Sequence, residues 1–133
     1  MNFGNLDLTV HADRGAVLQV RHPVFKNQIL EGVTITLLGY DSSMRKRRYA
    51  DFKKKAVQNS ITGAATDCVN ETDEIRALSV LSWTGIEYDG VTVEFNLANA
   101  KREFERHEWL AQQVDNFIAD RKNFFLTEGN DLS

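Results

Sequence analysis

The residue types that most often carry out chemistry are few in this chain and far apart. Its three histidines, His11, His22 and His107, fall in three different predicted elements and show neither HxxxH nor HExxH spacing. Its single cysteine, Cys68, has no cationic neighbour in the sequence that would activate the thiol. No glycine-rich phosphate loop is present either. We therefore expect no metal, no cofactor and no catalytic site.

Carboxylates are plentiful, but their spacing points to a helix surface. Acidic and basic residues alternate at three- and four-residue separations, which is typical of ion pairs along a solvated helix face. These residues are Glu103, Glu105, Glu108, Lys101, Arg102 and Arg106. The sequence predicts that the protein is not an enzyme.

The most unusual chemical feature is a basic segment. Residues 41–58 hold seven Lys or Arg and two Asp, a local charge of +5, while the whole chain carries −3. Three interpretations remain open: a solvated amphipathic helix, a contact with an acidic protein that includes a second copy of this chain, and a contact with nucleic-acid phosphates. The acidic sequence pI of about 5.6 makes nucleic acid the least favoured of the three. The candidate contact residues are Arg45, Arg47, Arg48, Lys53, Lys54 and Lys55.

Length and composition indicate one folded unit. The chain has 133 residues, of which 42% are hydrophobic, enough for one core. We predict a single domain over residues 1–126 and a disordered polar tail over 127–133. The N-terminal segment does not resemble a signal peptide, and no apolar run approaches the roughly 20 residues that span a bilayer. The expectation is a cytoplasmic protein with a reduced thiol and no membrane contact.

The first 40 residues read as β-rich. Alternating apolar residues predict strands around 6–10, 17–20 and 33–38, and the last of these is rich in β-branched side chains. Together they predict a three-stranded antiparallel meander. So small a sheet needs other elements packed on it, because few-stranded sheets are marginal in water.

The remainder reads as helical. Helices are predicted over 43–58 and about 73–81, and a third is expected to begin after an Asn96 cap, with Leu97, Ala100 and Phe104 on one face. A new helix is expected to start near Glu108. The predicted fold class is α+β and helix-dominated, with the small meander, residues 1–40, packed on a bundle of about four helices within 41–126.

The C-terminal third contains the most specific pattern. Trp-x-Gly-Ile precedes an Asp-Gly turn, an Asn-capped helix and the run Trp-Leu-x-x-Gln-Val-Asp-x-Phe-Ile-x-Asp-Arg-x-Asn-Phe. A spacing of three to four residues is expected to place large side chains on one helix face that packs in the core, over Leu110, Val114, Phe117, Ile118, Arg121 and Phe125. The motif residues are Trp83, Gly85, Asp89, Gly90, Asn96, Trp109, Leu110, Val114, Phe117, Ile118, Arg121 and Phe124.

These pieces, with Leu38-Gly39-Tyr40-Asp41-Ser42 upstream, resemble the tail assembly chaperones of long-tailed bacteriophages over about two-thirds of the chain. The resemblance implies a small protein of the host cytoplasm that binds the tape measure protein and recruits tail tube subunits. It also implies self-association and absence from the finished virion, and it brings no catalytic residues. Two alternatives stay open: another phage tail or head–tail structural protein, and a nucleic-acid-binding regulator that uses residues 43–58.

Overall fold

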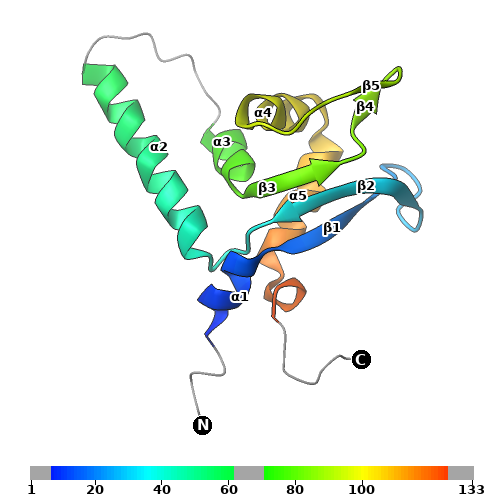
Figure 1. Cartoon of the computed structure of the whole chain (residues 1–133), viewed down its shortest axis with the longest axis horizontal. Helices are drawn as coiled ribbons and strands as arrows, with labels where there is room; N and C mark the ends of the chain where they lie inside the picture. Colours follow the sequence, from blue (N-terminus) through cyan, green and yellow to red (C-terminus); the bar gives the residue numbers. More distant parts are fainter. Residues whose placement is uncertain (1–6, 62–70, 126–133) are drawn as a thin grey trace.

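Helices and a small sheet alternate along the chain in the computed structural model, which describes residues 7–61 and 71–125 (Figure 1). The predicted α+β, helix-dominated class is confirmed. The elements in order are α1 (Leu8–Arg14), β1 (Ala16–Arg21), β2 (Ile29–Leu37), α2 (Ser43–Ile61), α3 (Glu71–Leu78), β3 (Val80–Thr84), β4 (Glu87–Tyr88), β5 (Val91–Thr92), α4 (Leu97–Arg106), α5 (Glu108–Ala119) and a 3-10 turn (Arg121–Asn123).

The main sheet is antiparallel with strand order β1-β2-β3. Leu18 of β1 lies opposite Ile35 of β2, and Ile35 lies opposite Trp83 of β3. Successive side chains of a strand point to opposite faces, and one face of this sheet is buried while Val17 on the other is 56% exposed. Figure 1 shows α5 crossing behind the strands. Within the described residues, α5 therefore covers one face of the sheet, and the other face carries exposed side chains such as Val17.

The core lies between this sheet and the C-terminal helices. Leu110, Val114 and Ile118 recur along α5 and are all buried, as are Ala100 and Phe104 of α4. They pack against the buried strand residues, which include Val20, Ile35, Leu37, Val80 and Trp83. Burial of side chains of this size stabilises a fold by roughly 1.5–3 kcal/mol each.

Two predictions about the sheet are wrong. The segment around 6–10 is not a strand, because Leu8–Arg14 forms α1, which Asp7 caps by accepting from the Thr9 N–H at 3.1 Å. The third strand is instead β3, whose first residues overlap the end of the helix that the sequence predicts over about 73–81. Helix α3 ends at Leu78. The carbonyl of the next residue, Ser79, accepts from the Leu38 N–H at 2.8 Å, which directs the chain into the sheet.

The predicted helix ends also change at the C-terminus. Asn96 caps α4 as expected, because its side chain accepts from the Asn99 N–H at 2.8 Å, and α5 starts at Glu108 as expected. However, α5 ends at Ala119, so Arg121 and Phe125 do not continue its face as predicted. Phe124 is nevertheless buried, with its ring edge-to-face on Phe117 at a centroid distance of 5.3 Å.

Candidate protein-binding site

Helix α2 carries the predicted contact residues, and its first turn is held by α1. The Ser42 hydroxyl accepts from the Arg45 N–H at 3.1 Å and so caps the helix. The Asp13 carboxylate accepts from the Met44 N–H at 3.1 Å and from the Ser43 hydroxyl at 2.7 Å. Burial raises the pKa of Asp13, but the hydrogen bonds from Ser42, Ser43 and Met44 outweigh it and leave the pKa below its usual value.

Two of the predicted contact residues anchor α2 to the body of the protein. Arg45 donates from Nε to the Ser79 hydroxyl at 2.7 Å, and burial lowers its pKa. Arg48 donates from Nη1 to the carbonyls of Leu78 and Val80 at 3.0 and 3.3 Å. These bonds satisfy backbone carbonyls where α3 passes into β3. The structure thus places Arg45 and Arg48 in internal contacts.

Beyond these anchors α2 stands away from the body (Figure 1). A groove lies beside this helix. The α2 side of the groove is formed by Arg48, Asp51, Phe52 and Lys55, whose spacing of three and four residues puts them on one face. The groove volume is about 390 Å³. Its opposite wall is mostly apolar and is formed by Glu74, Ala77, Leu78, Val80, Leu81, Phe95 and Leu97.

The other face of α2 is basic and open to solvent. Lys46, Arg47, Lys53 and Lys54 are exposed there, and Val57 is 58% exposed. Lys53 lies over the ring of Tyr49 at 5.0 Å, so its charge sits close to the helix surface. The predicted contact set therefore divides in three. Arg45 and Arg48 anchor the helix, Lys55 lines the groove together with Arg48, and Arg47, Lys53 and Lys54 face outward.

A second polar cluster holds the β4–β5 hairpin against α4, and the sequence did not indicate it. Glu103, expected on a solvated face, is buried at 3% exposure and accepts from the Tyr88 hydroxyl. The same hydroxyl lies 2.9 Å from His107 Nε2. Burial first, and then the bond to Glu103, raise the pKa of Tyr88, which keeps the phenol protonated as a donor. This arrangement fixes the hairpin.

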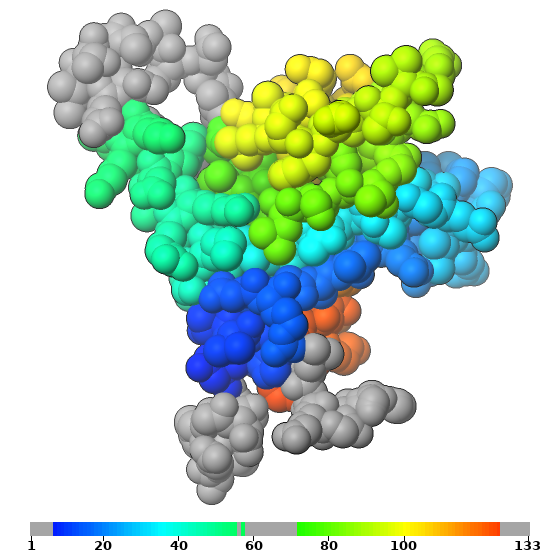
Figure 2. Space-filling view, in the orientation of Figure 1, coloured from blue at the N-terminus to red at the C-terminus, as the bar shows by residue number. Residues whose placement is uncertain are grey.

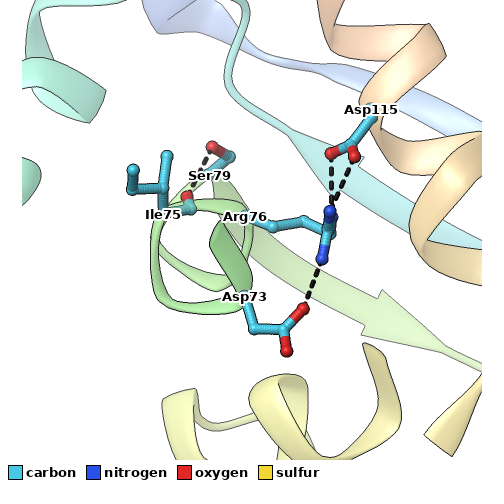
Figure 3. Close-up of polar contacts among 5 residues, drawn as sticks. All are labelled: Asp73, Ile75, Arg76, Ser79 and Asp115. Carbon is cyan, nitrogen blue, oxygen red and sulfur yellow. Dashed lines mark hydrogen bonds and ion pairs between the residues drawn. The ribbon is translucent and has the colours of Figure 1, made fainter. Parts of the chain in front are cut away.

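A buried ion-pair network joins α3 to α5 (Figure 3). Arg76 donates to Asp115 from Nε and Nη2 at 2.8 and 2.7 Å, and to Asp73 from Nη1 at 2.6 Å. The hydrogen bonds to Asp115 are the main reason that the pKa of Arg76 is raised. Because Nε, Nη1 and Nη2 of Arg76 all donate to carboxylates of this same protein, we assign the network a role in stabilising the fold.

Most of the C-terminal motif residues are engaged in contacts or turns that shape the fold. Trp83 donates from Nε1 to the Val93 carbonyl at 2.9 Å, and Gly85 adopts φ 81° where a Cβ would lie 2.2 Å from the Gly32 carbonyl oxygen. Asp89 and Gly90 form the predicted turn with φ of 51° and 84°. Of the remaining motif residues, Trp109 is half-buried, and Arg121 pairs with Asp41 at 2.7 Å on the surface.

Comparison with known proteins adds no assignment: no family model, curated protein or solved structure matches this chain. Within residues 7–61 and 71–125, no group of three or more His, Cys, Asp or Glu is arranged to hold a metal ion. None of the helices in the same ranges is long and apolar enough to cross a bilayer. Cys68 and the predicted tail 127–133 lie outside the described residues.

Proposed function

We propose that this protein is a tail assembly chaperone of a long-tailed bacteriophage. It binds the tape measure protein and brings tail tube subunits to it in the host cytoplasm, acts through self-association into rings or spirals, and is not retained in the finished virion. The resemblance of the segments 38–42 and 83–124 to that family supports the assignment. The proposed activity is contact between polypeptides, with no covalent step.

The single observation that carries the proposal is the exposure of α2 on two faces. Its anchors, Arg45 and Arg48, belong to its first half, while the later part of the helix borders the groove on one side and solvent on the other. A helix exposed in this way does little for the core, since burial of apolar area is what stabilises a fold. Surfaces of this kind are typical of protein contact sites.

The outward face of α2 is the proposed contact for the tape measure protein. Lys46, Arg47, Lys53 and Lys54 attract acidic stretches of a long partner, and each contact is weak because it is exposed to water and salt. Many copies of the protein on one partner chain gain avidity from repeated weak contacts. Modest affinity per copy also allows tail tube subunits to displace the chaperone.

Co-expression tests this proposal. The tagged chain is expressed with the product of the long, coiled-coil-rich gene that we expect immediately downstream, and we expect the two to co-purify at low salt. The variant Lys46→Glu/Lys53→Glu should lose the partner, because both charges lie on the outward face. The control Arg14→Glu/Lys26→Glu makes the same change of charge at exposed positions away from α2 and should retain it.

Failure of the wild-type protein to co-purify would refute the tape measure assignment, as would equal capture by both variants. A gel shift on duplex DNA tests the alternative that the protein binds nucleic acid. Binding that weakens steeply with salt would indicate phosphate contacts and would replace the proposal.

A further inference from the structure

The loop between β1 and β2, residues 22–28, places two apolar side chains on the surface. Val24 is 71% exposed and Phe25 is 63% exposed. Figures 1 and 2 show this loop at the outer end of the two strands, at the right edge of the molecule. Exposed apolar patches often mark contact surfaces, and a surface that is ordered before it binds loses less conformational entropy on binding. What holds this loop in one conformation therefore matters.

The side chain that holds the loop is an imidazole. His22 Nδ1 accepts from the backbone N–H of Val24 and from that of Phe25, both at 3.0 Å. The rings of His22 and Phe25 lie in contact, with their centroids 5.0 Å apart. The His22 N–H donates to the Gln28 carbonyl at 2.8 Å, and the Gln28 N–H donates to the Phe25 carbonyl at 2.8 Å, so backbone bonds close the loop.

The two bonds to Nδ1 require the neutral form of the imidazole. A neutral histidine has one acceptor nitrogen and one N–H donor, whereas in the charged form both nitrogens carry a proton and both are donors. Because Nδ1 of His22 accepts, the proton of the neutral ring is on Nε2. A proton that binds at Nδ1 removes the acceptor of both backbone N–H groups and places a third N–H beside them.

The charged groups around His22 offer no replacement for these bonds. The loop joins β1 to β2, and β1 also packs on α5. The other ionisable residues of these three elements and the loop are Arg21, Lys26, Glu31, Glu108 and Asp115. Arg21 Nη1 donates to the Lys26 carbonyl at 3.3 Å, so two cations lie at this end of the hairpin. Helix α5 contacts the same end through Gln113, an uncharged amide that bonds to the Arg21 backbone at 2.9 and 2.8 Å. Among the residues that the structure describes, no carboxylate forms an ion pair with His22, so the charged imidazole gains none in exchange.

We infer that His22 is a proton-sensitive switch: its neutral form holds the loop 22–28 in the conformation that presents Val24 and Phe25, and its protonated form frees the loop. Imidazole is the side chain whose charge ordinarily changes between about pH 5 and 8, so acidification within that range opens the loop. The loss of two hydrogen bonds should raise the population of the open loop about tenfold or more. The switch lies outside α2 and goes beyond the proposed function.

Amide exchange with water, measured by NMR on the full chain, tests the inference. The protection factor is the exchange rate of an unstructured peptide at the same pH divided by the rate in the protein. For the amides of Val24 and Phe25 it should fall about tenfold or more between about pH 7.5 and about pH 5. The amide of Ile35, a core residue of β2, should stay protected at both pH values.

Two substitutions of His22 separate its acceptor from its ring. His22→Phe keeps a ring that can pack on Phe25 but has no acceptor, so the loop amides should be unprotected at both pH values. His22→Asn supplies an amide oxygen, which accepts from the same backbone positions in an Asx turn and does not titrate. Asparagine before a proline, here Pro23, also favours a turn. This variant should stay protected at both pH values.

The control His11→Asn removes a histidine from α1 and should keep the wild-type response, and circular dichroism verifies that each variant is folded. The inference is overturned if the wild-type protection factors are equal at both pH values. It is also overturned if His22→Asn responds to pH like the wild type, if His22→Phe is protected at about pH 7.5, or if His11→Asn loses the response.

Discussion

Replacement of Arg76 by methionine removes the charge at the centre of the α3–α5 network while retaining an unbranched apolar side chain. The Arg76 side chain is 9% exposed, and its guanidinium lies 5.8 Å from the centre of the Phe104 ring. Its partners differ, because the Asp73 side chain is 12% exposed and the Asp115 side chain is 51% exposed. In the variant Asp115 regains contact with water, whereas Asp73 is left as a buried charge without its cation.

The expected loss follows from this difference. Breaking a buried ion pair by removing one partner costs about 3–5 kcal/mol. Because one of the two carboxylates is half-exposed, we expect the lower end, about 3 kcal/mol. With a urea m-value of about 1–3 kcal/mol/M, the unfolding midpoint should fall by about 1–3 M. Urea titration followed by circular dichroism and by tryptophan fluorescence measures it.

A second variant distinguishes the cost of leaving the Asp73 charge buried from the cost of losing the contacts of Arg76. Arg76→Met/Asp73→Asn removes the buried carboxylate charge as well and should be more stable than Arg76→Met alone. Arg121→Met breaks a similar pair with Asp41 on the surface and should shift the midpoint much less. A loss below about 1 kcal/mol for Arg76→Met, or no recovery in the double variant, would refute the reasoning.

Three further predictions concern single positions. Asn96→Ala should cost about 1 kcal/mol in urea unfolding through loss of the α4 cap, and a cost near zero would contradict the cap. Gly85→Ala should destabilise far more than Gly90→Ala, since both have positive φ but only Gly85 meets backbone at 2.2 Å; equal thermal shifts would disprove this. The raised pKa of Tyr88 stabilises the fold fully below about pH 10 and less above it. The difference in free energy of unfolding between the wild type and Tyr88→Phe, measured by urea unfolding, should therefore be smaller at alkaline pH than at neutral pH.

The strongest local patterns predicted the elements that they form. The basic helix, the strands around 17–20 and 33–38, the Asp89-Gly90 turn and the Asn96 cap are confirmed. In each case the signal lies within a few residues: a capping side chain, a glycine at positive φ, or an apolar repeat over two turns. The signal for the break between α4 and α5, just before Glu108, also lies within a few residues.

The errors occur where distant residues decide the structure. The alternation around 6–10 is too short to distinguish a strand from one helical turn, and the helix forms where Asp13 can bond to the start of α2. The start of the third strand was missed because Leu78 and Leu81 lie three residues apart, a spacing that fits a helix, so the predicted helix runs past the end of α3 at Leu78. Residues 80–84 become a strand because they pair with the edge of β2 that β1 does not occupy.

The amino-acid sequence by itself determined that α2 is basic and amphipathic and that residues 87–94 are acidic, because these are properties of composition and spacing. The tertiary structure alone decided that Arg45 and Arg48 turn inward and that Glu103 is buried. Burial and pairing depend on which distant backbone groups approach each side chain. No local pattern contains that information, since it arises only when the sheet and the helices pack together.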